Sequence, residues 1–266
     1  MNKITIVNDQ INKINLNKSI DMSFCEKECL FGINKLIIEI KKNTSLNIEI
    51  KLEDISKLEI VIKVLENKTS NLNIYTLGDS GKIKYKYELG KNSICNVTKF
   101  SSVSDIREMV IADLNNEYSN LNYNFKTICT NQEKYDFMIY HKYNNTVSNI
   151  KNNGVNIKEG KLNYQVSTFI PKDIKGAIAN QFNRIMNLTD NKCEIKPNLY
   201  IDSYDISANH SALIGKFSDE EMFYLKSRGI DEESALKLLI TGFLLSGIES
   251  KEIKNKIIKT INKYWR

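Results

Sequence analysis

The stretch DISANHSALIGKFSDEEMFYLKSRGIDEESALKLLITGF runs from Asp205 to Phe243 and decides how the chain is organised. Its first part alternates polar and apolar residues, which is typical of a β-strand. After Gly215 the pattern changes to helix-start signals and helical spacing. The sequence therefore predicts a β core domain at residues 1–215 and a C-terminal helical domain at residues 216–266.

The first predicted helix follows the sequence SDEE at Ser218–Glu221. This is the pattern of a capping box, in which the Ser218 hydroxyl accepts from a free backbone N–H and Glu221 reaches back to the cap. Gly229 can adopt the left-handed conformation that often ends a helix. We expect a helix over 219–228 whose apolar contacts come from Met222, Phe223 and Leu225.

Two more helices are predicted after the first. Asp231 can cap the second, Gly247 can stop it, and Ser250 can cap the third. The side chains expected to face the core of the second helix are Ala235, Leu238, Leu239 and Phe243. Those at helical spacing in the third are Ile253, Ile257, Ile258, Ile261 and Trp265.

From Ile4 to about Ser207 the sequence has a period of two, which predicts strands with one buried face. No long helical pattern interrupts this region, so a doubly wound α/β fold is excluded. Many short strands in series fit a sandwich, a barrel or a solenoid, and no repeat of fixed length chooses among them. The clearest alternating sets are Ile48, Ile50 and Leu52; Leu58, Ile60, Ile62 and Val64; and Ile83, Tyr85, Tyr87 and Leu89.

Four segments break or blur this alternation. Polar clusters at Glu66–Ser70 and Gly78–Lys82 predict turns between strands. Ser19–Lys35 is interpreted as a short helix or a cap over the first strands. Ser104–Glu117 fits either a strand or a helix.

Composition narrows the class of protein. The formal charge of the 266-residue chain is +6, but Lys and Arg alternate with acidic residues and Asn, which favours a solvated surface over a nucleic-acid site. No apolar run is long enough to span a bilayer, and the N-terminus has no secretory signal pattern. The sequence predicts a cytoplasmic protein without a nucleic-acid or membrane partner.

The five cysteines are odd in number and scattered, which fits reduced thiols better than a disulfide framework. Cys25 and Cys29 would lie on one face of a helix, but no second ligand pair follows at the spacing of a zinc site. Ordinary buried or half-buried thiols are the preferred interpretation. The other three are Cys95, Cys129 and Cys193.

Residues 208–215 and 223–230 carry an AxHxAxIG pattern and the sequence FYLKSRGI. Upstream lie the QxNR pattern at Gln181–Arg184 and the KPxL pattern at Lys196–Leu199. Further upstream, the stretch from His141 contains Thr146, Ser148 and Gly154. Together these resemble the SufB/SufD family, subunits of the SUF system for iron–sulfur (FeS) cluster assembly, over roughly residues 135–247.

The resemblance implies a right-handed parallel β-helix (a β-solenoid) with a small C-terminal α-helical domain. It also implies that one end of the solenoid forms a dimer and that the helical domain docks the ABC-type ATPase SufC. Phe223, Tyr224 and Arg228 are then candidate contacts, although Phe223 and Tyr224 could simply pack the helices. The short chain, without a recognisable N-terminal helical region, suggests a compact member.

His210 matches the SufD histidine that faces the SufB subunit close to the nascent cluster. Imidazole is a common metal ligand, but one imidazole cannot hold a cluster alone, so His210 would supply part of a shared site. The alternative is a histidine that orients the loop by hydrogen bonds, which is also the preferred role of His141. Ser211 and Phe182 stand where SufB has a glutamate and a cysteine, and Ala208 where some SufD proteins have a cysteine. The chain is therefore identified as SufD-like.

The first hypothesis is a non-catalytic scaffold that pairs with a SufB-like subunit or with itself, binds a SufC-like ATPase, and contacts a transient iron–sulfur cluster without an intrinsic cofactor. No GxxxxGK[ST] phosphate loop occurs, so ATP hydrolysis is not expected. The alternatives are a cytoplasmic β-helix enzyme using Asp202 and Asp205 near His210, and a purely structural homodimeric subunit.

Overall fold

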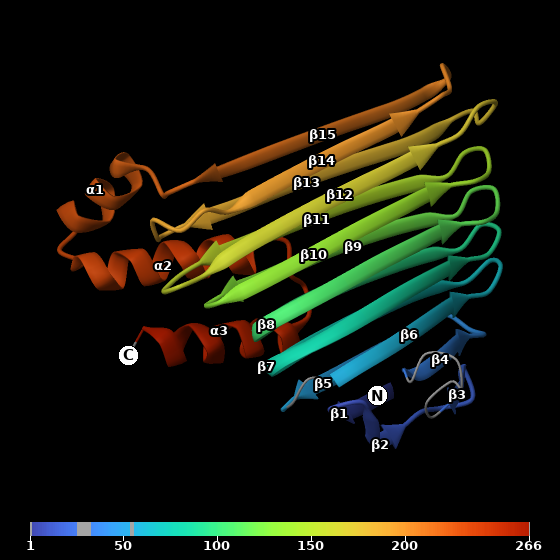
Figure 1. Ribbon diagram of the computed structural model, residues 1–266, viewed down its shortest axis with the longest axis horizontal. Helices are drawn as coiled ribbons and strands as arrows, with labels where there is room; N and C mark the ends of the chain where they lie inside the picture. Colours follow the sequence, from blue (N-terminus) through green and yellow to red (C-terminus); the bar gives the residue numbers. More distant parts are fainter. Residues whose placement is uncertain (1, 26–32, 54–55, 266) are drawn as a thin grey trace.

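The computed structural model describes residues 2–25, 33–53 and 56–265. The described residues form a β-solenoid of about seven turns followed by three helices, so the predicted fold class is confirmed (Figure 1). The strands are β1 (Asn2–Val7), β2 (Gln10–Asn15), β3 (Ile20–Cys25), β4 (Asn34–Ile40), β5 (Thr44–Leu52), β6 (Ser56–Val64), β7 (Thr69–Leu89), β8 (Ile94–Leu114), β9 (Asn120–Cys129), β10 (Gln132–His141), β11 (Val147–Asn156), β12 (Lys161–Ile170), β13 (Ala177–Asn187), β14 (Glu194–Ile201) and β15 (Ile206–Gly215). The helices are α1 (Asp219–Ser227), α2 (Glu232–Leu245) and α3 (Lys251–Tyr264).

The solenoid has two faces of parallel strands. The first face runs in the order β15-β13-β11-β9-β8-β7-β5-β1, and the second in the order β14-β12-β10-β8-β7-β6-β4. The 21-residue strands β7 and β8 belong to both faces. Antiparallel pairing is limited, among the described strands, to β1 with β2 and β3 with β4 at the N-terminal end.

One of the predicted turns is wrong. Glu66–Lys68 does separate β6 from β7, but Gly78–Lys82 lies inside the continuous strand β7. The chain bends there at Gly78, whose φ of +135° is a backbone conformation that glycine adopts readily and other residues rarely adopt. A Cβ at this position would also lie only 1.8 Å from the carbonyl oxygen of Leu52. The bend therefore joins the two faces without ending the strand.

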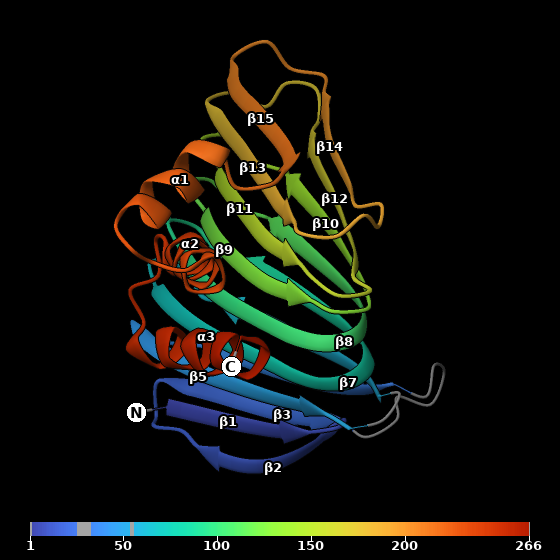
Figure 2. The same ribbon diagram turned by 90° about the vertical axis from the view of Figure 1, so that its left-hand side faces the viewer.

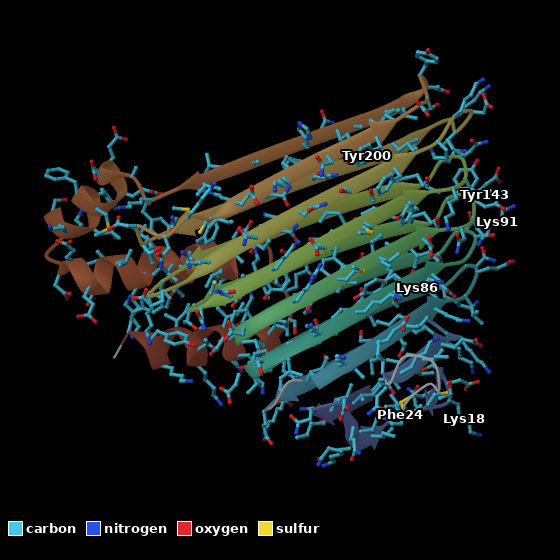
Figure 3. All side chains as sticks on the ribbon, in the orientation of Figure 1. Lys18, Phe24, Lys86, Lys91, Tyr143 and Tyr200 are labelled. Atoms are coloured by element: carbon cyan, nitrogen blue, oxygen red, sulfur yellow. The ribbon has the colours of Figure 1, made fainter. Side chains whose placement is uncertain are left out.

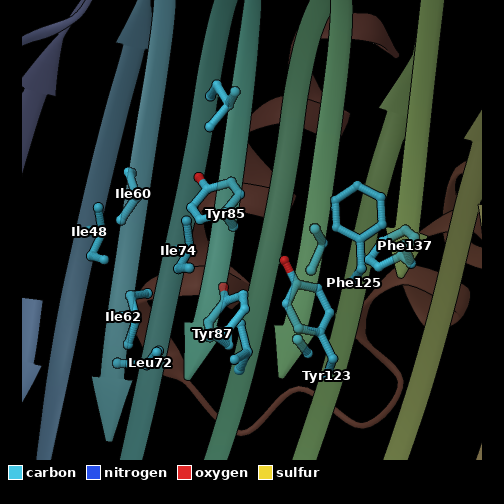
Figure 4. Packing of buried hydrophobic residues seen from close by; sticks show 14 of the residues in the cluster. Ile48, Ile60, Ile62, Leu72, Ile74, Tyr85, Tyr87, Tyr123, Phe125 and Phe137 are labelled. Carbon is cyan, nitrogen blue, oxygen red and sulfur yellow. The ribbon is translucent and has the colours of Figure 1, made fainter. Parts of the chain in front are cut away.

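The core fills the lumen, the space enclosed by the two faces. The alternating residues predicted as buried all lie here, with Ile60, Tyr85 and Tyr87 fully buried (Figure 4). Aromatic rings from successive turns pack edge to face, for example Phe125 and Tyr164 at a centroid distance of 6.1 Å. Such pairs add to the burial energy of a core.

An asparagine ladder on the outer surface of the first face explains why no fixed repeat was visible in the sequence. Its members are in register, and each side-chain amide donates to the carbonyl oxygen of the preceding member. The spacing varies between 25 and 31 residues along the chain. The turns thus repeat in space with varying length. The ladder consists of Asn71, Asn96, Asn122, Asn149, Asn180 and Asn209.

The helices α2 and α3 lie against the outer surface of the first face, as Figure 2 shows. Their buried residues Ile240, Leu244, Ile253, Ile257 and Ile261 form one hydrophobic cluster with residues of the sheet. The sheet contributes Phe100, Ile128, Val155 and Met186. Helix packing and solenoid stability are therefore coupled through this cluster.

The helix limits and caps agree with the prediction, but two burial assignments do not. Ser218 and Glu221 form the capping box, and Asp231 and Ser250 accept from the first turns of α2 and α3. Leu238 is 52% exposed, because Ala235, Ile240 and Leu244 form the packed side of α2. Phe223 is also exposed, since no residue of α1 is buried.

Two ambiguous segments are resolved as strands where the structure describes them. Ser19–Lys35 contains β3 and the start of β4, so the expected helix is wrong over residues 20–25. Cys25 is the last residue of β3 and exposed, while Cys29 lies outside the described residues. Ser104–Glu117 continues β8 as far as Leu114. None of the helices in the described ranges is long and apolar enough to cross a membrane.

Candidate functional site

The solenoid ends at β15, which pairs with β13 and leaves its other edge open. We call the inward-facing row of this last strand the open end: Ile206, Ala208, His210, Ala212 and Ile214. These residues are in register with Ala177, Ala179, Gln181, Asn183 and Ile185 of β13, which are buried. In-register residues of parallel strands point to the same side of a sheet. The open end therefore continues the lumen row, but no further turn covers it.

His210 lies at the middle of the open end and is exposed. Its register partner Gln181 is fully buried, and the Gln181 side-chain nitrogen donates to the Thr168 hydroxyl at 2.8 Å and to the Asn198 carbonyl at 3.1 Å. The amide oxygen of Gln181 is buried without a hydrogen-bond partner. A buried acceptor without a partner is costly and marks a place where a donor or a ligand would be stabilising.

The ligand set at the open end is incomplete for a cluster. Iron–sulfur clusters are usually held by several protein ligands, mostly thiolates. The described residues contain no group of three or more His, Cys, Asp and Glu side chains that could hold a metal ion. His210 could therefore supply one ligand, and a second chain would have to supply the others.

A polar layer lies directly beneath the open end. The Asn152 amide donates to the carbonyl oxygen of Asn183 at 2.8 Å, and Asn183 donates to the backbone carbonyl of Ser211 on β15 at 3.3 Å. Both asparagines are buried. These bonds tie β11 and β13 to the last strand and fix its register beside His210.

A buried ion pair in the middle of the lumen was missed by the sequence analysis. Lys99 on the first face donates to Glu108 on the second, and both side chains are fully buried. Burial lowers the pKa of Lys99 and raises the pKa of Glu108, since it penalises both charged forms. The sequence does carry a signal for the burial of Lys99, because Lys99 occupies an inward position in the alternation of Cys95, Val97 and Ser101.

A second buried carboxyl group lies one turn further along. Glu133 accepts from the Thr127 hydroxyl at 2.6 Å and the Tyr135 hydroxyl at 2.9 Å. Burial raises the pKa of Glu133 to about 8, so this carboxyl is mostly protonated at neutral pH. The lumen thus carries a polar cluster within an otherwise apolar core.

The surroundings of His141, the other histidine, are those of a residue with a structural role. It is the last residue of β10 and is fully buried. Its Nδ1 lies 2.8 Å from the Thr146 hydroxyl and its Nε2 lies 2.8 Å from the Ser148 hydroxyl. Both ring nitrogens are therefore engaged by hydroxyl groups, which leaves none for a metal.

The burial of His141 predicts a loss of stability in acid. Burial lowers its pKa to about 4 from the ordinary 6.5, so the folded chain resists protonation. Above pH 6.5 both folded and unfolded forms are neutral and the contribution is complete. As the pH falls from 6.5 to 4 only the unfolded chain takes up the proton, which removes up to about 3 kcal/mol of stability.

Urea unfolding of the wild type and of His141→Gln at pH 7.5 and pH 4.5 measures this effect. Glu133 and the other acids titrate in both proteins. The difference between the two proteins in the stability lost on acidification therefore reports the contribution of His141 alone. We expect the wild type to lose about 2 to 3 kcal/mol more than the variant on acidification. Equal losses would show that His141 does not titrate with folding.

The partner-binding residues predicted from the sequence lie together on α1. Phe223 is 75% exposed and Tyr224 is 59% exposed, so neither serves mainly to pack the helices. The Arg228 guanidinium lies 5.3 Å from the centroid of the Tyr224 ring, a cation–π contact. We call Phe223, Tyr224 and Arg228 the α1 face. An exposed aromatic pair beside an arginine has the composition of an interface hot spot.

The enzyme hypothesis requires the two aspartates to act together with His210. Asp202 follows β14, and Asp205 immediately precedes β15. His210 lies five residues beyond Asp205 along an extended chain, which corresponds to about 16 Å. This separation is too large for the Asp205 carboxylate and the His210 imidazole to act on one bond.

Similarity to known proteins bears on this arrangement. Residues 24–243 match the family model described as "SUF system FeS cluster assembly, SufBD core domain". The chain is 36% identical over 97 residues to an iron–sulfur cluster assembly SufBD family protein of Mycobacterium leprae, which covers 35% of this chain and 25% of that protein. A protein of the same description from Staphylococcus haemolyticus is 31% identical over 105 residues, covering 39% of this chain and 23% of that protein. The matched stretches thus span about a quarter of the length of these relatives.

Proposed function

Because the chain belongs to the SufBD family of iron–sulfur cluster assembly proteins, we propose that it is a non-catalytic, SufD-like scaffold subunit of a cytoplasmic cluster assembly complex. In this proposal the chain binds no cofactor of its own, and the cluster is cargo that forms on a shared site. The observation that carries it is the open end, where His210 lies exposed above the buried Gln181.

The proposed partner at the open end is a SufB-like subunit or a second copy of this chain. An open strand edge offers unpaired backbone groups to another chain. Ile214, the last residue of the open end, is an apolar side chain with 43% exposure. Pairing there would cover the apolar surface and bring ligands from the partner to His210.

The SufD-like assignment rests on what the open end lacks. The described inward positions of β13 and β15 hold no cysteine, aspartate or glutamate. Phe182, at the position of the SufB cysteine, is in register with Ser211 and lies on the outward row. The chain would therefore complete a site whose thiolates come from the partner.

A purely structural homodimeric subunit is the second candidate function. The same lack of thiolate and carboxylate ligands favours it, because two copies of this chain would bring together only two imidazoles. Iron and sulfide bound to the assembled complex separate the two candidates. The scaffold role requires bound cluster, whereas the structural role does not.

The proposed dock for a SufC-like ABC ATPase is the α1 face. Replacing both aromatic residues in Phe223→Ala/Tyr224→Ala is expected to weaken binding of the ATPase at least about tenfold, since exposed aromatic anchors carry much of an interface energy. The free energy of unfolding should change little, because no residue of α1 is buried. Co-purification and binding isotherms with the ATPase measure the effect.

The matched control is Tyr143→Ala/Tyr200→Ala, which removes two aromatic rings of similar exposure elsewhere on the molecule (Figure 3). This control should bind the ATPase like the wild type. If both double variants bind equally well, the α1 face is not the dock. If the wild type shows no binding under any nucleotide condition, the ATPase partnership itself is wrong.

A further inference from the structure

A groove separates helices α1 and α2 from the last strands of the first face. It has a volume of about 920 Å³, which is in the range of small-molecule sites. Its floor is formed by β11, β13 and β15, and its wall by α2, with Glu221 of α1 at one side. Neither His210 nor the α1 face lines this groove.

One side of the groove is cationic. Lys151 and Arg184 line it, and neither forms an ion pair with a carboxylate among the described residues. The Arg184 guanidinium lies 5.3 Å from the centroid of the Phe243 ring, which holds it along the wall. Two cationic groups thus face the same space without a protein counterion.

A third basic side chain, Lys126, lies beside the floor, in register with the groove residue Asn153. Lys126 is fully buried, and its ammonium lies 2.9 Å from the side-chain amide of Asn153 when the amide oxygen faces it. Burial, together with a smaller contribution from the nearby Lys151, lowers the pKa of Lys126 to about 7. A buried lysine without a carboxylate is unfavourable, and an anion in the groove would offset that cost.

The one acidic residue that lines the groove is already engaged. The Glu221 carboxylate accepts from the backbone N–H of Ser218 at 2.9 Å as part of the capping box. It therefore serves the helix N-terminus. The charge of the groove is positive, with room for an anionic ligand.

The remaining lining is apolar and unusually exposed. Phe182, Leu213 and Leu238 are 49%, 50% and 52% exposed, and they come from β13, β15 and α2. With Phe243 they offer flat and aliphatic surface beside the two cations. A planar apolar group with a negative charge would cover these side chains and pair with Arg184 and Lys151 at once.

We propose that this groove binds a small aromatic anion, with its ring against Phe182 and Leu238 and its charged group on Arg184 and Lys151. Ala212 of the open end contributes to the edge of this groove, whereas His210 and the α1 face lie outside it. An arylsulfonate, an aryl phosphate or an aryl carboxylate would share this recognition. Neutral aromatic compounds lack the negative charge that would pair with Arg184 and Lys151.

The test uses the purified 266-residue chain and the fluorescent probe 1-anilinonaphthalene-8-sulfonate. The wild type should bind it with enhanced emission, and phenyl phosphate should displace it far better than inorganic phosphate. Lys151→Gln/Arg184→Gln should weaken probe binding about tenfold, since two charge-assisted contacts are lost. Leu238→Glu, which places a carboxylate in the groove, should abolish the binding.

The matched control is Lys82→Gln/Arg107→Gln, which removes one lysine and one arginine from neighbouring strands of the other face. It should bind the probe like the wild type, and N-phenyl-1-naphthylamine, the neutral analogue, should bind weakly to all proteins.

Equal weakening of probe binding by both double variants would overturn the proposed site. So would probe affinity that changes with protein concentration, because a second copy would then occupy the groove. Displacement of the probe from the wild type needs no variant, and its failure would also overturn the proposal.

Discussion

Replacing Glu108 with glutamine is expected to lower the free energy of unfolding by about 3 to 5 kcal/mol. Lys99 and Glu108 are fully buried and pair across the lumen, and the Lys99 ammonium also lies 4.2 Å from the centroid of the Tyr85 ring. Removing the carboxylate leaves the ammonium buried without a counterion, or forces it to lose its proton. Urea unfolding at pH 7 measures the loss.

Two further variants identify the cause of the expected loss. Lys99→Met/Glu108→Leu removes both charges and should recover most of the stability, since an apolar pair often replaces a buried ion pair at little cost. Glu59→Gln breaks the partly exposed pair with Lys84, whose charged atoms are 3.2 Å apart, and should cost less than about 1 kcal/mol. If Glu108→Gln costs no more than Glu59→Gln, the lumen pair does not support the fold.

Replacing Ala212 with lysine is expected to abolish pairing at the open end. Ala212 lies two residues from His210 on the same inward row. An inward-pointing charge on an edge strand is a common means of preventing strand addition, and a charge buried in an interface without a partner costs several kcal/mol. The dissociation constant should therefore rise by more than about a hundredfold.

Sedimentation analysis of the chain alone and with a SufB-like subunit measures this pairing. Ser207→Lys is the control, because Ser207 is an exposed residue of β15 on the opposite, outward row. It should pair like the wild type. A wild type that stays monomeric with itself and with the SufB-like subunit would refute pairing, and an Ala212→Lys variant that pairs normally would place the interface elsewhere.

Local chemistry made much of the fold predictable. The alternating sets in β5, β6 and β7 are buried as expected, and the caps Ser218, Asp231 and Ser250 begin the three helices. These features depend on neighbours in the sequence. The resemblance to SufBD proteins, and not the strand period, distinguished a solenoid from a sandwich or a barrel.

The wrong predictions concern positions whose structure depends on residues that are distant in the sequence. Gly78 lies in a polar cluster typical of a turn, but pairing with β5 and β8 keeps β7 continuous through it. Leu238 has a position on α2 that suits burial, yet Ile240 and Leu244 are the residues of α2 that pack in the cluster with the sheet. Lys99 and Glu108 look like surface charges until the register places them across the lumen.

The candidate site was predictable in part. The histidine pattern selected His210, but its place above Gln181 depends on the register of β13 and β15. The bonds from His141 to Thr146 and Ser148 give a physical reason for the spacing of that motif. The cationic groove had no signal in the sequence, because Lys126, Lys151 and Arg184 come together only across three strands and a helix.

The iron and acid-labile sulfide content of the anaerobically purified complex tests whether His210 belongs to a shared cluster site. The chain is co-expressed with its SufB-like and SufC-like partners, as wild type and as His210→Ala, and subunit stoichiometry is checked in each. We expect bound cluster in the wild type and a large loss in the variant at unchanged assembly. Equal iron and sulfide in both complexes would leave His210 without a role at a shared cluster site.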